Sequence, residues 1–173
     1  MDKFENTRAI DDIKRFHLPK YNEIPDVGLF LEQTTKYVSG YLENLEGITI
    51  TSSMISNYVK KKLIDNPIKK QYYRDQIVYI IFIAIAKSVL SLEEIEHLIN
   101  VRGKQYDCKE LYEYFCNEFE SNLYSVFGIT PEAKEEPYPQ NEDRFLLHNT
   151  IITASHKIYL DKIFALRIHS DQE

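Results

Sequence analysis

The sequence predicts an all-α protein with one small β-hairpin: a winged helix-turn-helix core followed by additional C-terminal helices. Two observations predict this class. Glycine and proline are scarce, with Gly 5 and Pro 6 in 173 residues, which favours helices over a turn-rich β-sandwich. A short polar helix, a basic turn, a basic aromatic hairpin and an apolar helix also follow one another from residue 52 onward, which is the order of a helix-turn-helix with a wing.

The N-terminal third of the chain predicts two helices joined by an extended connector. Residues 2–16 mix charge with spaced apolar positions, as in a short amphipathic helix. Residues 17–26 contain two prolines and predict the connector. Apolar residues at helical spacing predict a helix over 27–45, and Gly47 ends it.

The next segment predicts a second short helix and the start of a hairpin. A helix is expected over about 52–64, with Thr51 or Ser52 as its N-terminal cap. The Asp-Asn-Pro sequence at 65–67 stops it. Residues 68–73 are short and aromatic, which suits one arm of a small hairpin.

Two helices of different character follow the hairpin. The first covers about 75–89 and contains the apolar run of residues 77–86, which is too short to span a bilayer and predicts a fully buried helix. The second opens at Ser91, where Ser-Leu-Glu-Glu has the form of a capping box, and runs through Asn100.

The C-terminal part predicts a pair of longer helices, at 107–127 and 144–169, joined by a proline-rich acidic loop at 128–140. Each helix carries an apolar stripe. The chain is therefore divided into an N-terminal arm (1–24), a winged helix-turn-helix domain (25–102) and a helical region for dimerisation or sensing (103–173).

Positive charge is concentrated between residues 52 and 74. This segment has a net charge of +5 within a chain of net charge −6, so the remaining residues carry −11. A cationic segment on an acidic protein indicates a polyanionic partner. The alternative is a solvated helix face, because lysines also favour the last turn of a helix.

Double-stranded DNA fits the composition of this segment. Serine and asparagine can bond base edges or phosphates, and lysines neutralise phosphates and release counterions. The predicted DNA-binding residues are Ser52, Ser53, Ser56, Asn57, Lys60, Lys61, Lys69, Lys70, Tyr72 and Arg74.

The sequence gives no support for catalysis. Nucleotide-binding glycine motifs, a hydrolase nucleophile elbow and a metalloprotease HExxH are all missing from it. Cys108 and Cys116 lie eight apart on a predicted helix, too far for a disulfide, and are expected to be reduced. Residues 1–16 lack the apolar core of a signal peptide. The expectation is a cytoplasmic non-enzyme without cofactor, metal or membrane contact.

Several of these residues form a pattern in residues 50–99. Tyr58 with 63–64 (Leu-Ile), Tyr73 at the start of the apolar helix, and Ser-Leu-Glu-Glu-Ile at 91–95 follow one another in this order. The segment resembles the DNA-binding domain of the mercury-resistance regulator (MerR) family. The resemblance implies a MerR-like winged helix-turn-helix that binds DNA as a homodimer.

The segment departs from the family's pattern at three places. Lys62 stands where the family has glycine, Ser56 stands where an arginine is expected, and lysines occupy the wing tip. Over residues 17–165 the chain also resembles an uncharacterised bacterial family that is presumed to bind DNA.

The leading hypothesis is a DNA-binding transcriptional regulator that acts as a homodimer. A second hypothesis is a protein-interaction adaptor that reuses the winged fold and binds an acidic protein through the same lysines. A small-molecule effector held among the tyrosine-rich C-terminal helices is compatible with the first hypothesis.

Overall fold

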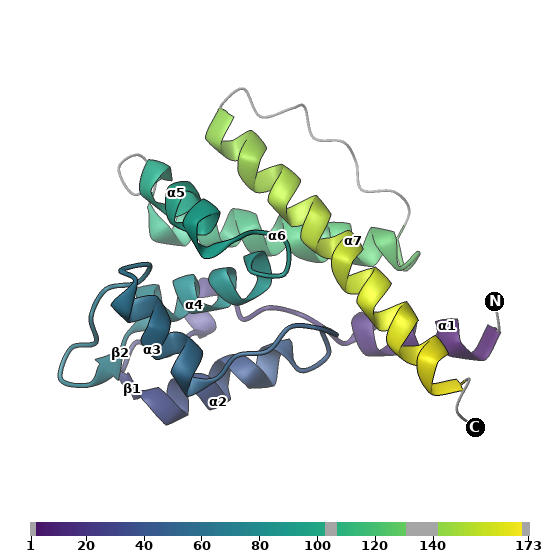
Figure 1. Cartoon of the computed structure of the whole chain (residues 1–173), viewed down its shortest axis with the longest axis horizontal. Helices are drawn as coiled ribbons and strands as arrows, with labels where there is room; N and C mark the ends of the chain where they lie inside the picture. The colour runs from purple at the N-terminus through teal and green to yellow at the C-terminus, as the bar shows by residue number, and fades with distance from the viewer. Residues whose placement is uncertain (1–2, 103–106, 131–141, 171–173) are drawn as a thin grey trace.

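The computed structural model describes residues 3–102, 107–130 and 142–170. These residues form seven α-helices and a two-stranded antiparallel sheet (Figure 1). In chain order the elements are α1 (Lys3–Lys14), a 3-10 turn η1 (Tyr21–Glu23), β1 (Leu29–Phe30), α2 (Leu31–Leu42), α3 (Ser52–Lys60), β2 (Gln71–Tyr72), α4 (Arg74–Ala86), α5 (Leu92–Arg102), α6 (Cys108–Val126) and α7 (Glu142–Ser170). The predicted helical class with a small sheet is confirmed.

The sheet shortens the helix that the sequence predicts over 27–45. Leu29 and Phe30 pair with β2 in antiparallel register, so α2 begins only at Leu31 and ends at Leu42. Gly28 lies so close to β2 that an added Cβ would be 2.7 Å from the Cβ of Gln71. Helical periodicity could not reveal this pairing, because the partner strand lies more than forty residues further along the chain.

α4 is the central helix of the core. Ten of its thirteen residues are buried, and the apolar run of residues 77–86 accounts for most of them. α2, α6 and α7 all contact α4, which explains why it is apolar all round. The prediction of a fully buried helix is confirmed. No helix in the described ranges is long and apolar enough to cross a membrane.

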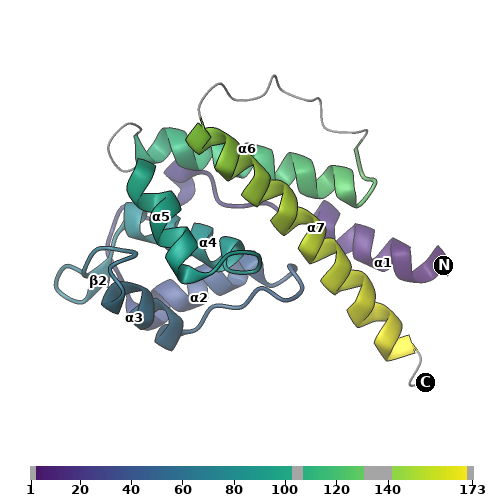
Figure 2. The ribbon, with the colours of Figure 1, turned by 45° about the horizontal axis from the view of Figure 1, so that its top comes forward.

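α6 and α7 pack against one another and cross obliquely, as Figures 1 and 2 show from two directions. Phe115 and Phe119 of α6 stack with ring centroids 5.7 Å apart, and Phe16 meets Phe119 edge-on. The C-terminal half of α7 extends to α1, where Lys162 forms an ion pair of 2.8 Å with Asp12. The N-terminal and C-terminal segments are therefore neighbours.

Two tyrosine hydroxyls of α6 hold the connector between α1 and α2. Tyr112 donates to the carbonyl of Pro19, and Tyr124 donates to that of Phe16. The extended connector predicted over 17–26 contains the single turn η1. Of the loop predicted over 128–140, residues 131–140 lie outside the described residues.

Candidate nucleic-acid interface

α3 is held by one buried face. Ile55 and Tyr58 are fully buried, and the helix packs against α2. Thr51 is the N-terminal cap, because its hydroxyl accepts a hydrogen bond of 3.2 Å from the backbone N–H of Met54. Burial of this face leaves Ser53 and Ser56 exposed on the other side.

Ser52 links α3 to α2. Its hydroxyl donates to Glu32 at 2.9 Å and lies 2.9 Å from the hydroxyl of Thr35. The side chain is half-buried, and so is that of Asn57. An acidic neighbour at the start of α3 opposes close approach of a phosphate there, so Ser52 has a role within the fold.

The C-terminal end of α3 is a hydrogen-bonded turn with a lysine in the left-handed conformation. The N–H of Leu63 donates to the carbonyl of Tyr58 at 2.9 Å, and the N–H of Lys62 donates to that of Val59 at 2.9 Å. This pair of bonds defines a Schellman motif, in which glycine is the usual residue at the position of Lys62. Lys62 has φ +59°, and α3 ends at Lys60, before the predicted residue 64.

A second tight turn carries Lys69 and Lys70. Ile68 and Gln71 exchange backbone hydrogen bonds of 3.0 and 2.9 Å around them. Lys69 has φ +48° and Lys70 has φ +66°, the two positive values that a type I′ turn requires. The predicted hairpin is thus a single two-residue turn, and β2 continues by pairing with β1.

Tyr72 and Arg74 face the body of the protein. Tyr72 is 4% exposed, and its burial raises the pKa of its hydroxyl. The Nε of Arg74 donates to the carbonyl of Ile24 at 2.8 Å, and its guanidinium lies 5.3 Å from the ring centroid of Tyr21. Both residues position β2 and the start of α4 and present little surface to a partner.

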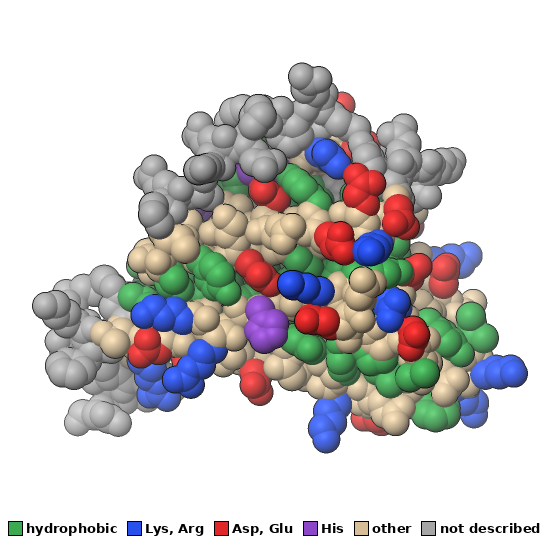
Figure 3. Space-filling model, turned by 180° about the vertical axis from the view of Figure 1, so that it is seen from behind, with side chains coloured by type: hydrophobic (Ala, Val, Ile, Leu, Met, Phe, Trp, Pro, Cys, Tyr) green, Lys and Arg blue, Asp and Glu red, His purple; other side chains and the backbone are tan. Residues whose placement is uncertain are grey.

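The five lysines at this end of the molecule are exposed: Lys60, Lys61, Lys62, Lys69 and Lys70. Among the described residues, none of them forms an ion pair with an acid. By contrast, acidic and basic side chains are interspersed on the face seen in Figure 3. We call these five residues the lysine surface.

The lysine surface is not covered by the C-terminal helices. Figures 1 and 2 both place α3 and the chain leading to β2 at the end of the molecule opposite the two termini. α7 runs away from this end, towards α1. Of the ten predicted site residues, Ser53, Ser56, Lys60, Lys61, Lys69 and Lys70 are exposed here, whereas Ser52, Asn57, Tyr72 and Arg74 are wholly or partly buried.

Two exposed apolar residues that are not among the predicted site residues lie beside the turn at Lys69 and Lys70. Phe30 is 50% exposed and Ile68 is 60% exposed, and each pairs with Gln71, one from each side. The sequence predicts a hairpin arm that begins at Ile68. Phe30 comes to lie near Ile68 only through the pairing of β1 with β2, which the sequence does not reveal. The lysine surface therefore has an apolar margin.

The fold and site define a helical protein with a small antiparallel sheet and an exposed cluster of lysines. The chain belongs to the family described as a domain of unknown function, DUF1836, whose model matches residues 19–115. That match includes every predicted site residue and ends within α6. No curated protein and no solved structure matches the chain. No cluster of histidine, cysteine or acidic residues suited to a metal ion is found in the described part of the chain.

Proposed function

We propose that this protein is a cytoplasmic, DNA-binding transcriptional regulator, in which α3 reads the duplex and the turn at Lys69 and Lys70 acts as a small wing. The order β1, α2, α3, turn, β2, α4 supports a MerR-like winged helix-turn-helix. The left-handed backbone at Lys62 supports it too, because Lys62 stands where the family that this segment resembles has glycine.

The observation that carries the proposal is the conformation of three lysines. Lys62, Lys69 and Lys70 are the non-glycine residues with positive φ in the described part of the chain. The left-handed conformation costs an ordinary L-residue about 1 kcal/mol, and glycine avoids that cost. Three cations held at positions that favour glycine indicate that their charge is used.

The dimensions of α3 suit a major groove. An α-helix with its side chains is about 10–12 Å across, which fits the roughly 12 Å width of the groove. The nine residues of α3, at about 1.5 Å per residue, give a length of roughly 14 Å. Ser53 and Ser56 are exposed where base edges would lie, and Lys60 follows them towards the phosphate backbone.

A second copy of the chain completes the proposed regulator, since two recognition helices address successive turns of DNA. α7 offers a face for this contact. Leu160, Phe164 and Ile168 are 47%, 55% and 57% exposed and lie four residues apart on one stripe. Antiparallel pairing about Phe164 would set Leu160 of one copy against Ile168 of the other.

The test is binding of labelled duplex DNA, measured by fluorescence anisotropy over a series of salt concentrations. We expect the slope of log affinity against log salt to steepen by about 0.9 for each phosphate neutralised. The variant Lys60→Glu/Lys61→Glu/Lys69→Glu/Lys70→Glu should lose affinity roughly a hundredfold or more at low salt. Selection of bound genomic fragments should yield a motif with two-fold symmetry.

A matched control changes the net charge equally at four lysines elsewhere on the molecule. The variant Lys14→Glu/Lys20→Glu/Lys87→Glu/Lys109→Glu should keep most of the affinity, because its lysines lie outside the lysine surface. Binding that is insensitive to salt, or equal losses in both variants, would show that DNA does not contact this surface specifically.

A protein-interaction adaptor is the second candidate, and one observation favours it. Phe30 and Ile68 place exposed apolar area beside charged side chains, and a protein interface combines an apolar centre with a polar rim. The partner would be an acidic protein. Capture from a nuclease-treated lysate distinguishes the two functions: an acidic protein retained by the natural chain and lost with Phe30→Ser/Ile68→Ser supports the adaptor.

A further inference from the structure

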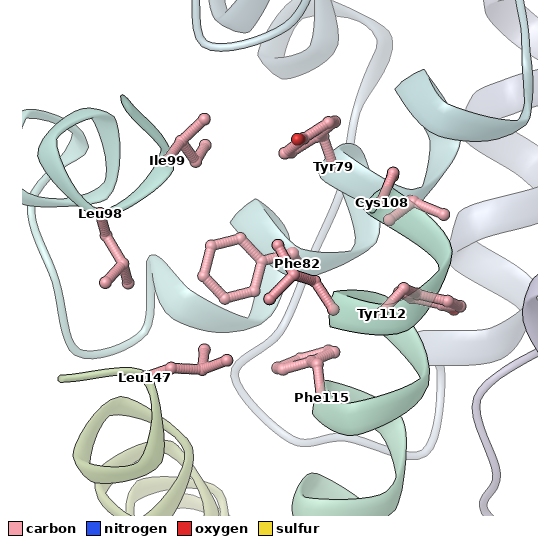
Figure 4. A pocket seen from close by; sticks show the side chains of 10 residues that line it. Tyr79, Phe82, Leu98, Ile99, Cys108, Tyr112, Phe115 and Leu147 are labelled. Carbon is pink, nitrogen blue, oxygen red and sulfur yellow. The ribbon is translucent and has the colours of Figure 1, made fainter. Parts of the chain in front are cut away.

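A pocket lies where α4, α5, α6 and α7 meet (Figure 4), and none of its lining residues belongs to the lysine surface. Its volume is about 50 Å³, and it is partly open to solvent. The walls include Val78 and Phe82 from α4, Leu98 from α5, Cys108 and Phe115 from α6, and Leu147 from α7. The pocket therefore joins the segment that contains the proposed DNA-binding elements to the C-terminal helix pair.

The lining of the pocket is uncharged. Among the lining residues, those with a polar side-chain atom are Tyr79, Tyr112 and Cys108. Tyr112 already donates to the carbonyl of Pro19 at 2.9 Å. Burial, together with the neighbouring Asp75 carboxylate, raises the pKa of the Cys108 thiol to about 12, so the thiol stays neutral. A charged ligand would find no counter-ion among these side chains.

Aromatic packing keeps the pocket from collapsing. Phe82 and Phe115 meet edge-on, with ring centroids 5.3 Å apart and an interplanar angle of 85°. Both rings are more than nine-tenths buried, as is Leu147 of α7. Unfilled apolar volume weakens a core, because the wall atoms lack partners for dispersion contacts. An apolar group that enters would restore those contacts.

We propose that this pocket binds the apolar end of a small uncharged molecule, namely a short linear alkyl chain whose polar end remains at the mouth. The volume of the pocket favours the end of an alkyl chain over an aromatic ring, because it is about a third of the volume of the ~150 Å³ engineered cavity that accepts benzene. A chain bound here contacts α4 and α5 on one side and α6 and α7 on the other. The inference does not depend on DNA binding at the lysine surface.

The test titrates the full chain with linear alcohols from 1-propanol to 1-octanol, followed by NMR of methyl-labelled valine, leucine and isoleucine. Affinity should rise about fourfold with each methylene until the pocket is full, and then level off. Shifts should concentrate on the methyl groups that line the pocket, which belong to Val78, Leu98, Ile99, Leu111 and Leu147. Shifts spread over methyl groups throughout the core, or affinity that rises without levelling off, would overturn the proposal.

A variant that reduces the volume of the pocket tests whether the alcohols bind there. Val78→Ile adds one methylene to the wall and should weaken alcohol binding roughly tenfold. Val89→Ile makes the same change at a partly buried position outside the pocket and should leave binding unchanged. Equal affinities of the two variants would contradict the proposal.

Xenon under pressure gives an independent reading on the natural chain if Val78→Ile does not fold. Xenon enters apolar cavities, so it should shift the same methyl groups as the alcohols. Xenon-induced shifts elsewhere, with none at the methyl groups that line the pocket, would place the accessible apolar volume outside this pocket and overturn the proposal.

Discussion

The C-terminal ends of α3 and α6 have the same hydrogen bonds but different residues at the left-handed position. At the end of α6, the N–H of Ile129 donates to the carbonyl of Tyr124 at 2.8 Å, and the N–H of Gly128 donates to that of Ser125 at 2.9 Å. Gly128 has φ +69°, and at the end of α3 the equivalent residue is Lys62 with φ +59°.

The residue at the left-handed position follows the backbone conformation at the end of α6, but not at the end of α3. At α6 the residue that best fits the conformation is present. At α3, and again in the turn at Lys69 and Lys70, a cation occupies a conformation that glycine or asparagine would adopt at lower cost. The unfavourable residues fall within the segment that carries the excess positive charge.

We expect the largest loss of stability from a substitution of Gly128 at the C-terminal end of α6. Gly128→Ala should lower the free energy of unfolding by about 1–2 kcal/mol, because the left-handed conformation disfavours a Cβ. No heavy atom lies within 4 Å of the position where that Cβ would stand, so the cost is that of the backbone alone. Urea-induced unfolding measures the change.

Gly40→Ala is the matched control for this variant. Gly40 lies within α2, and its Cβ position is equally open. Alanine in a helix should raise the free energy of unfolding by roughly 0.5–1 kcal/mol. If both alanine variants changed stability in the same direction, the backbone at Gly128 would not be the cause.

The helical elements could be predicted from periodicity and caps, and the details of the candidate site could not. The apolar run of residues 77–86 favours a buried helix for α4, because it is longer than the usual buried strand. Ser91 and Glu94 form the expected reciprocal capping bonds. Both features depend on residues close in sequence.

The parts that escaped prediction depend on long-range pairing or on individual φ angles. The β1–β2 pairing converts Leu29 from a helical to a strand residue and turns Tyr72 towards the core. The positive φ angles of three lysines contradict the local preference of lysine, so no propensity argument could have located them. The placement of the lysine surface could be predicted, but its backbone strain could not.

The turn at Lys69 and Lys70 can be given the residues that its conformation favours. Lys69→Asn/Lys70→Gly supplies the preferred type I′ sequence and should raise the free energy of unfolding by about 1 kcal/mol. If the lysines contact phosphates, the same variant should reduce the salt slope of DNA binding by up to about 1.8. Thermal unfolding and the anisotropy titration measure the two effects.

Lys69→Arg/Lys70→Arg keeps both the charge and the backbone cost, so it should leave stability and the salt slope close to those of the natural chain. A gain in stability for the Asn-Gly variant with no change in DNA binding would show that the charge of this turn is not used to bind a polyanion.

The smallest expected effect concerns Lys62. Lys62→Gly relieves about 1 kcal/mol of backbone cost but gives the unfolded chain more freedom, so the net gain should be about 0.5 kcal/mol. Lys62→Ala removes the charge and keeps the left-handed strain, and should bring no such gain. Both variants should lower the salt slope of DNA binding by about 0.9, because each loses one phosphate contact. If both variants lower the salt slope equally and only Lys62→Gly raises stability, DNA binding depends on the charge of Lys62 and stability depends on its backbone conformation. If neither variant changes the salt slope, Lys62 does not contact DNA.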